Sequence, residues 1–191
     1  MSELDTITPG TWVIDPTHTE IGFTVRHIMS RVRGKFEKFE GQIVSGDVVD
    51  NATATATVDL SSINTGTQQR DDHLRSSDFF NVDKTKTMTF TSTGLHPKGD
   101  GFVVTGDLAI GDVTRSVEWD VEFLGAGNDP WGGQRIGLEV TGKLSRRDFG
   151  IDFNIPLEGD KLMIGDTIHI QVNVEAVLQT DAAAGDAAAT A

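Results

Sequence analysis

Apolar and polar side chains alternate along much of this chain with the period of two that is typical of β-strands. The stretch "SVEWDVEFLG" (residues 116–125) shows the pattern most clearly, because its apolar residues fall on one face and its acidic residues on the other. The same alternation occurs in residues 21–25, 52–56 (where alanine is the apolar residue), 102–110, 136–140 and 168–174. Two less regular runs, 34–44 and 87–93, are also strand-like. The pattern predicts about eight strands.

Turn signals separate these segments. Residues 96–101 ("HPKGDG") predict a tight hairpin, 111–114 ("GDVT") join another pair, and 125–134 form a longer Gly-rich loop. Antiparallel strands with one solvated side are typical of an all-β barrel or sandwich. We favour a barrel, because the strands are long and the alanines of residues 52–56 would leave space inside a closed sheet. A sandwich could use the same pattern to fill its core.

Only residues 68–80 ("QQRDDHLRSSDFF") have helical character. They contain no β-branched residue, and Leu74 lies outside any period-two pattern. Thr67 or Ser61 could cap short helical turns. We expect a short helix that closes one end of the barrel, with Leu74 and the two phenylalanines packed inward.

The composition limits the partners. The 191 residues suit one domain, and 16 Lys and Arg against 29 Asp and Glu give a net charge of −13. An acidic surface repels phosphate groups, so we expect no nucleic acid partner and no stable membrane insertion. The absence of cysteine excludes disulfides and thiolate metal sites.

The chain ends carry little apolar surface. We expect a loose N-terminus over residues 1–10, a folded domain over 11–178 and a disordered Ala-rich tail over 179–191. Neither a secretory signal nor an apolar run of bilayer length is visible, which favours a cytoplasmic location. The oligomeric state, with a homodimer among the options, is left open.

Several segments, in order along the chain, resemble the YceI-like family. They are "WVIDPTHTEIGFTVRH" (12–27), "GKFEKFEGQI" (34–43), "RDDHLRSSDFFN" (70–81), "FTSTG" (90–94), "GDLAIGDVTRSVEWDV" (106–121) and "DPWGGQRIGLEVTGKLSRRDFGI" (129–151). The resemblance implies a lipocalin-like, eight-stranded antiparallel barrel with a long apolar pocket for a polyisoprenoid or related long-chain amphiphile. Many relatives are periplasmic. The resemblance implies no catalytic residue, metal or cofactor.

The strand pattern and the resemblance together predict a ligand cavity. Its expected lining residues are Phe23, Val25, Phe36, Phe90, Phe102, Leu108, Trp119, Val121, Phe123, Ile136, Leu138 and Val140. Periodicity alone leaves open a barrel interior that is completely filled. The resemblance favours the interior that holds a ligand.

Polar residues near one rim could contact the head of such a ligand. The candidates are His27, Arg70, His73 and Arg75. Asp71, Asp72 and His73 form a poor metal site, because neighbouring residues on a helical turn point in different directions. Residues 70–75 therefore predict mainly ion pairs and hydrogen bonds that hold the helix, with head-group contact as the alternative.

Three functions fit these observations. The first is a non-catalytic carrier of an isoprenoid lipid. The second is an enzyme that acts on a small hydrophobic substrate in the same cavity, with His27 or His73 as acid or base. The third is a filled barrel that acts through protein contacts. No second catalytic group accompanies either histidine in the sequence, which favours the carrier.

Overall fold

A computed structural model of the chain describes residues 7–48 and 51–180. Most of the expected loose N-terminus and nearly all of the expected tail lie outside these ranges. The strands are β1 (Gly10–Ile14), β2 (Glu20–His27), β3 (Ser30–Phe36), β4 (Phe39–Ser45), β5 (Thr53–Asp59), β6 (Ile63–Asn64), β7 (Thr87–Lys98), β8 (Gly101–Ile110), β9 (Val113–Asn128), β10 (Gln134–Ser145) and β11 (Ile164–Leu178). The helices are α1 (Gln68–Arg75) and two 3-10 turns, η3 (Leu60–Ser62) and η4 (Arg146–Phe149).

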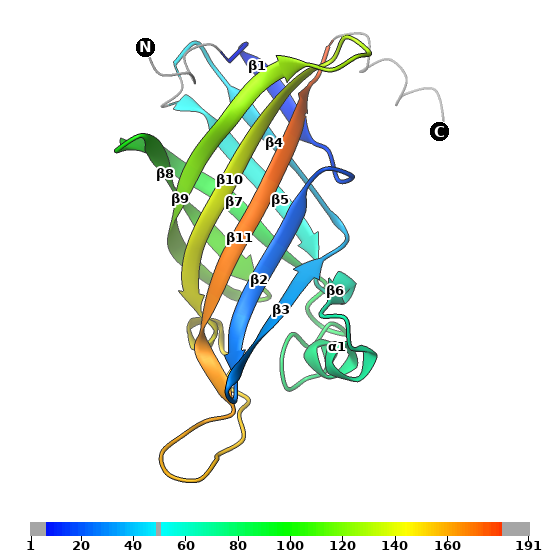
Figure 1. Ribbon diagram of the computed structural model, residues 1–191, viewed down its shortest axis with the longest axis vertical. Helices are drawn as coiled ribbons and strands as arrows, with labels where there is room; N and C mark the ends of the chain where they lie inside the picture. The colour runs from blue at the N-terminus through cyan, green and yellow to red at the C-terminus, as the bar shows by residue number, and fades with distance from the viewer. Residues whose placement is uncertain (1–6, 49–50, 181–191) are drawn as a thin grey trace.

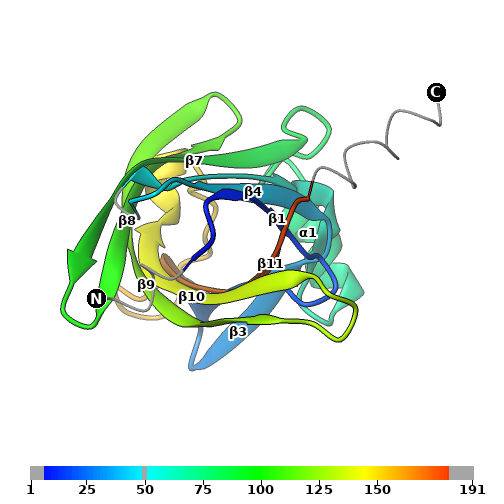
Figure 2. The same cartoon turned by 90° about the horizontal axis from the view of Figure 1, so that it is seen from above.

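The strands form an antiparallel barrel (Figures 1 and 2). They belong to one 11-stranded sheet, in the order β1-β4-β5-β7-β8-β9-β10-β11-β2-β3-β6, and β1 also pairs with β11. That pairing closes a ring of eight strands, since β2, β3 and β6 branch from it. The predicted all-β, eight-stranded, lipocalin-like barrel is confirmed, and the sandwich is excluded.

The sheet branches at β11. The C-terminal end of β11 pairs with β1, Trp12 lying opposite Leu178, whereas its earlier part pairs with β2, Ile170 lying opposite Phe23. β3 pairs with β2 along its length and with β6 only at Lys35 and Phe36. The hairpin of β2 and β3 therefore continues the barrel wall toward the end where α1 lies (Figure 1). We name this end, with α1 and η4, the lower end, and the end with the β9–β10 connection the upper end.

Most strand predictions match elements of the barrel, and two are wrong in detail. Residues 34–44 are not one strand, because the chain leaves the sheet at Glu37 and Lys38 and divides the run into β3 and β4. The expected loop at 125–134 is shorter, because β9 continues to Asn128. The hairpin at 96–101 is confirmed, with β7 ending at Lys98 and β8 beginning at Gly101.

Helix α1 lies at the lower end of the barrel beside β6 (Figure 1). It begins directly after Thr67, which is one of the two residues expected to cap it. It ends at Arg75, and residues 76–80 form turns rather than helix. Leu74 and Phe80 pack against buried Leu60 and its neighbours. Neither this helix nor any other in the described ranges is long and apolar enough to cross a membrane.

Three groups of buried apolar side chains hold the wall together. One surrounds Trp12 at the upper end, one surrounds Leu60 next to α1, and one joins Trp119 to Phe149 of η4. The clusters lie along the barrel rather than merging into one filled centre, so the interior keeps a cavity.

Candidate functional site

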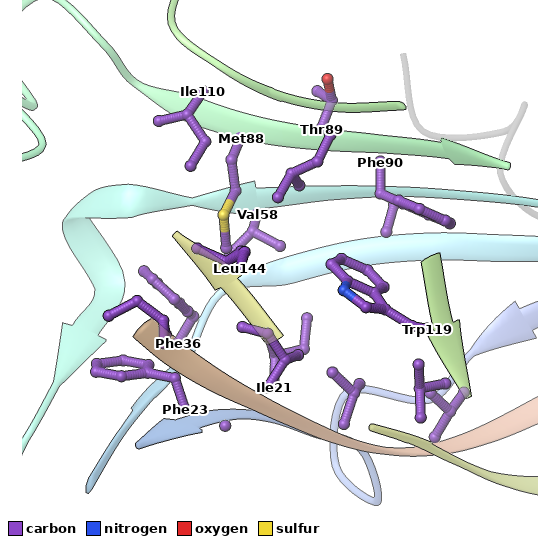
Figure 3. A pocket seen from close by; sticks show the side chains of 18 of the residues that line it. Ile21, Phe23, Phe36, Val58, Met88, Thr89, Phe90, Ile110, Trp119 and Leu144 are labelled. Carbon is purple, nitrogen blue, oxygen red and sulfur yellow. The ribbon is translucent and has the colours of Figure 1, made fainter. Parts of the chain in front are cut away.

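An apolar cavity of about 480 Å³ runs inside the barrel. Inward side chains from every strand of the ring line it, together with residues of β2, β3, α1 and η4. Figure 3 shows part of this lining, with Phe23 and Phe36 toward one side and Phe90 and Trp119 toward the other. The volume lies within the range of roughly 300–1,000 Å³ that is usual for pockets that bind small molecules.

Eleven of the twelve residues expected in the cavity line it: Phe23, Val25, Phe36, Phe90, Phe102, Leu108, Trp119, Val121, Ile136, Leu138 and Val140. Phe123 is not among the lining residues, and its side chain packs against the cluster of Trp12 and Ile136. The pairing of β9 with β10 is irregular here, because Leu138 lies opposite Phe123 while Gly137 lies opposite Gly125. The shift follows Phe123, so Phe123 keeps the face of Trp119 and Val121 and packs into this cluster instead of facing the cavity.

Aromatic rings of the lining lie over glycines of neighbouring strands. A Cβ atom built on Gly142 would lie 2.0 Å from Cδ1 of Trp119, and one on Gly106 would lie 2.4 Å from the Phe90 ring. Phe23 lies over Gly34 in the same way, at 2.4 Å. Side chains cannot come so close, so only glycine leaves room for a ring against the wall. These glycines let large apolar side chains cover the wall without filling the cavity.

Trp119 carries a polar atom without a partner. Its ring stacks on Phe90 at a centroid distance of 5.2 Å and an angle of 22°. Its indole Nε1 is buried and has no hydrogen-bond acceptor among the described residues. The ring is therefore held by packing against Phe90 and over Gly142 rather than by a hydrogen bond to a described residue.

Three of the four candidates for head-group contact line the cavity near its lower end. His27 ends β2, while Arg70 and His73 belong to α1. The fourth, Arg75, does not line the cavity. Its guanidinium donates to the backbone oxygens of Ser61 and Ile63, at 2.8 and 2.9 Å, and so fastens α1 to the segment before it.

The other charges of α1 are also engaged. Arg70 donates from Nε to Oγ1 of Thr65 at 2.7 Å. Asp71 is buried and accepts from the Thr65 backbone N–H at 2.9 Å and from the Thr65 hydroxyl. The partner of Arg75 is Asp72, at 3.0 Å. Hydrogen bonds and ion pairs with nearby residues thus involve most of the charged side chains of α1.

His73 keeps a distinct position. Its Nε2 lies 2.8 Å from Oδ2 of Asp78, and its ring makes edge contacts with Phe79 and Phe153 at 5.0 and 4.9 Å. The imidazole is therefore oriented by a carboxylate on one side and by apolar rings on the other. Such an arrangement can present one ring edge to a polar group of a ligand.

The cavity lining also contains a buried cation that no pattern in the sequence predicted. Arg146 of η4 is 4% exposed and donates to the backbone oxygens of Ile151, Phe153 and Gly165 and to Asp166. Burial lowers the pKa of its guanidinium. Because these acceptors occupy all three nitrogens, Arg146 serves to fix the turn after β10 rather than to bind an anion.

The segment after Arg146 also lines the cavity, through Phe149, Ile151, Phe153 and Ile155. These residues alternate with polar ones in the sequence, which is a period-two signal that could have identified them. The structure shows a 3-10 turn and an irregular segment here instead of a strand, although the alternate side chains still point inward.

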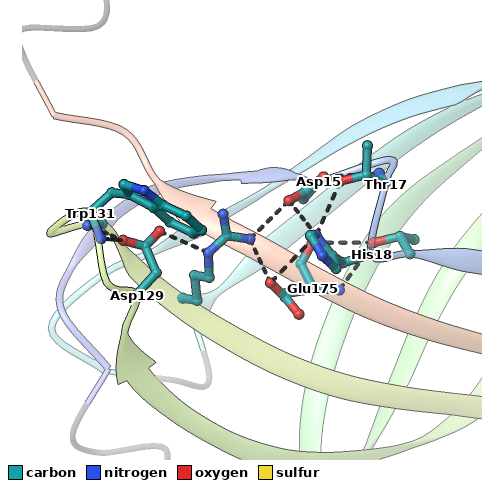
Figure 4. A network of polar contacts seen from close by, with 9 residues as sticks. Asp15, Thr17, His18, Asp129, Trp131 and Glu175 are labelled. Atoms are coloured by element: carbon teal, nitrogen blue, oxygen red, sulfur yellow. Dashed lines mark hydrogen bonds and ion pairs between the residues drawn. The ribbon is translucent and has the colours of Figure 1, made fainter.

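A polar network joins the ends of four segments at the upper end (Figure 4). Arg135 of β10 contacts Asp15 at 2.8 Å and Asp129 at 2.9 Å, and it also pairs with Glu175 of β11 at 2.5 Å. His18 Nδ1 lies 2.9 Å from Asp15. The network links the β1–β2 connection, the β9–β10 loop and the neighbouring strands, where the barrel closes.

Among the described residues, Asp15, His18 and Glu175 lie close enough together to hold a metal ion, since one ligand atom of each lies within 4.8 Å of the others. However, Nη1 of Arg135 already contacts the same oxygens of Asp15 and Glu175. A metal ion would place a second cation beside the guanidinium. The residues therefore fit an ion-pair network better than a metal site.

The network changes the pKa values of its members. Hydrogen bonds from the Thr17 hydroxyl, then from Arg135 and His18, hold the pKa of Asp15 well below its ordinary value of 3.8. The hydrogen bond from Arg135, with the Gly133 and Trp131 backbone N–H groups, lowers the pKa of Asp129. The same carboxylates raise the pKa of Arg135. All these charges are stabilised at neutral pH, which is the behaviour of a structural network.

A family model described as the YceI-like domain matches residues 12–176. A UPF0312 protein of Staphylococcus aureus is 37% identical over 168 residues, which cover 86% of this chain and 95% of that protein. A UPF0312 protein of Staphylococcus epidermidis is 38% identical over 165 residues, covering 84% and 94% of the two chains.

Solved structures share the barrel. BcnA of Burkholderia cenocepacia superposes with a TM-score of 0.74 at 20% identity, covering 85% of this chain and 98% of that one. A YceI protein of Campylobacter jejuni gives a TM-score of 0.67 at 29% identity, covering 80% and 88%. A polyisoprenoid binding domain from Saccharophagus degradans gives 0.68 at 15% identity, covering 88% and 98%.

Proposed function

Because this chain belongs to the YceI-like family, we propose that it is a non-catalytic carrier that holds a long-chain isoprenoid, or a similar amphiphilic lipid, in the barrel cavity. The observation that carries the proposal is the apolar cavity of about 480 Å³ inside a closed barrel. A protein that needed the barrel only as a scaffold would gain stability by filling it.

The lining favours an apolar chain over a polar ligand. Inward leucine, isoleucine, valine and phenylalanine side chains from opposite walls surround the space (Figure 3). Burial of apolar surface stabilises a complex by roughly 25 cal/mol per Å², so a chain that buries several hundred Å² can bind usefully without any polar contact. An elongated lipid also follows the long axis of the barrel.

The head of the ligand would lie toward the lower end, where His27, Arg70 and His73 line the cavity. His73 is the strongest of these candidates, because Asp78, Phe79 and Phe153 already orient its ring. Arg75 is a weak candidate, since its nitrogens bind backbone oxygens and Asp72. We therefore propose that the ligand's head group contacts His73, with His27 and Arg70 nearby.

The comparisons support a binding protein. The Saccharophagus degradans domain is described as polyisoprenoid binding, and it has the same fold. The staphylococcal relatives carry names that specify no reaction. A lipid carrier agrees with both, and a closed apolar cavity gives it a physical basis.

Native mass spectrometry and organic extraction of the purified protein test this function. We expect one lipid per chain, or uptake of one added polyprenol or isoprenoid quinone by the delipidated protein. A protein that is empty and also takes up neither compound would refute the carrier. Recovery of a chemically changed ligand, with the change lost in a His27→Ala or His73→Ala variant, would instead establish an enzyme.

A further inference from the structure

The outer face of the barrel carries a group of cations in register across four strands. Lys143 of β10 lies opposite His169 of β11, which lies opposite Thr24 of β2, which lies opposite Arg33 of β3. The same pairing sets Arg26 opposite Arg31 and Gly22 opposite Lys35. We name the exposed residues Arg26, Arg31, Arg33, Lys35 and Lys143 the basic face.

The basic face is unusual for this protein in two respects. It gathers five of the 16 Lys and Arg residues of a chain whose net charge is −13. Within the described ranges, none of the five forms an ion pair with a carboxylate. Arg26 and Arg31 even lie directly opposite each other, and like charges in that position destabilise a sheet. Arg26 donates to the backbone oxygens of Ile28 and Leu162, whereas the other four cations have no such side-chain partner within the described ranges and are free to contact an external anion.

The hairpin that bears this face ends in exposed apolar side chains. Met29 is 94% exposed and Ile28 is 43% exposed. Ile28 has a φ of 52°, a conformation that glycine or asparagine usually supplies and that is rare for a β-branched residue. Its backbone N–H donates to Met163 at 2.7 Å, and Arg26 donates to its oxygen at 3.2 Å. The tip is therefore held in place with its apolar residues turned outward.

The same strands line the cavity on their inner side. Val25, Val32, Ile168 and Leu144 point inward from β2, β3, β11 and β10. His27 at the base of the hairpin tip lines the cavity as well, opposite Ile164. A partner on the basic face would thus lie one sheet thickness from the bound lipid, beside the lower end of the cavity.

We propose that the basic face and the tip residues Ile28 and Met29 dock the protein on an anionic phospholipid bilayer, and this inference rests on the proposed carrier function. Guanidinium groups and Lys ammonium groups suit lipid phosphates, and exposed apolar side chains at the end of the cation group suit the acyl boundary below them. A nucleic acid would use the cations and leave Met29 in water. Docking would bring the lower end of the cavity to the membrane from which a lipid is taken.

The overall negative charge does not prevent this contact. Screening limits charge interactions to about 8 Å at physiological ionic strength, so the groups nearest the bilayer decide close binding. Glu158 and Asp160 in the loop between η4 and β11 are exposed acids of the segment that binds Ile28. They oppose contact through that loop, so the hairpin and the sheet face, rather than the loop, meet the bilayer.

Flotation with unilamellar vesicles tests the proposal. We expect binding to vesicles that contain phosphatidylglycerol, with little binding to pure phosphatidylcholine, and weaker binding as salt increases. Arg31→Gln with Arg33→Gln should weaken partitioning by roughly 25-fold, since each basic residue near an anionic surface contributes about fivefold. Met29→Ser should weaken it by about tenfold.

Matched variants separate the basic face from bulk charge. Lys98→Gln with Arg115→Gln removes the same two charges from exposed positions on β7 and β9, and should change partitioning by less than about twofold. Trp131→Ser removes an apolar side chain that is 86% exposed beside Asp129, and it should have no effect. Equal losses in the two charge variants would overturn the proposal.

Two further outcomes are decisive. A wild-type protein that does not float with phosphatidylglycerol vesicles would overturn the inference, and so would binding of poly-glutamate in place of vesicles, which would assign the face to an acidic protein. Native mass spectrometry of the same variants reports lipid uptake separately. A protein that floats but takes up no lipid keeps the docking surface and loses the carrier function, and the reverse result does the opposite.

Discussion

Two regions of β10 and β11 differ in how completely their polar groups are paired: the outward network at the upper end and the inward wall at Gly142. At the upper end, Arg135 and Glu175 point outward into a network in which the guanidinium contacts three carboxylates (Figure 4). On the inner side, Gly142 leaves a space that the Trp119 ring covers, and Nε1 of that ring has no partner in the described structure. The charges of the network all have partners, whereas the inner wall leaves room.

The difference separates stability from binding. The charged groups of the network are already paired with one another, so they are not free to bind a ligand, although they hold the end of the barrel together. A wall of apolar side chains around an unfilled cavity contributes less to stability than a packed core, but it can bind the apolar chain of a lipid. Variants of the network should therefore change stability alone, whereas variants of the wall should change the bound ligand too.

Gly142→Ala should have the largest effect. The new Cβ would lie 2.0 Å from Cδ1 of Trp119, so the ring must move into the cavity. We expect the free energy of unfolding to fall by about 1–3 kcal/mol, because the ring is forced out of its packed position. Lipid uptake should also fall, because the displaced ring occupies part of the cavity. Urea denaturation and native mass spectrometry measure the two effects.

Gly127→Ala is the matched control, since a Cβ there meets nothing within 4 Å. It should leave both stability and uptake unchanged. If Gly142→Ala lowers stability and binds lipid as well as the wild type, the ring does not border the ligand and the comparison between the two regions fails.

Arg135→Met should have a smaller effect, confined to stability. The side chain is partly exposed, so water can replace some of its contacts, but Asp15, Asp129 and Glu175 lose their shared cation. The midpoint of urea denaturation should fall by less than in Gly142→Ala. Lipid uptake at a temperature where the variant is folded should equal that of the wild type, and a loss of uptake would connect the network to the ligand.

Acid should remove part of the same stabilisation. The pKa of Asp15 and that of Asp129 are lowered in the folded protein, so both carboxylates stabilise the fold above their ordinary pKa of 3.8. That contribution is lost as the pH falls below this value and through the lowered pKa values. Urea midpoints at pH 7, 4 and 3 should fall less steeply in Arg135→Met than in the wild type, and parallel curves would show that Arg135 does not set these pKa values.

Trp119→Phe should have the smallest effect. The substitution keeps a ring over Gly142 and removes a donor that has no partner, so the free energy of unfolding should change by less than about 1 kcal/mol. Thermal denaturation checks this. A larger loss would mean that Nε1 makes an important interaction, such as a bond to a buried water molecule.

The sequence predicted the barrel well, because alternation reports directly which side chains share a face. Most of the cavity lining followed from that alternation, from Phe23 to Val140. Phe123 shares the face of these residues but packs into the cluster of Trp12 and Ile136, a contact between distant segments that alternation does not report. The stacking of Trp119 over Gly142 depends on the register of neighbouring strands, which no single segment contains.

The charges of α1 and the Arg135 network also show what a local sequence pattern cannot predict. The charges of α1 are neighbours in sequence and so form a visible motif, yet most of them bind the local backbone, as Arg75 does. The Arg135 network was missed because its members come from positions as far apart as Asp15 and Glu175. A network whose residues come from distant segments leaves no recognisable pattern in any single stretch of the sequence.

The central claim is that an isoprenoid chain lies inside the barrel, and intermolecular nuclear Overhauser effects test it most directly. The measurement uses delipidated protein with labelled methyl groups and an added unlabelled polyprenol. We expect contacts from the lipid to the inward methyl groups of Val104, Leu108, Leu144 and Ile170. Contacts confined to outward methyl groups, such as those of Val48 and Leu124, would contradict it.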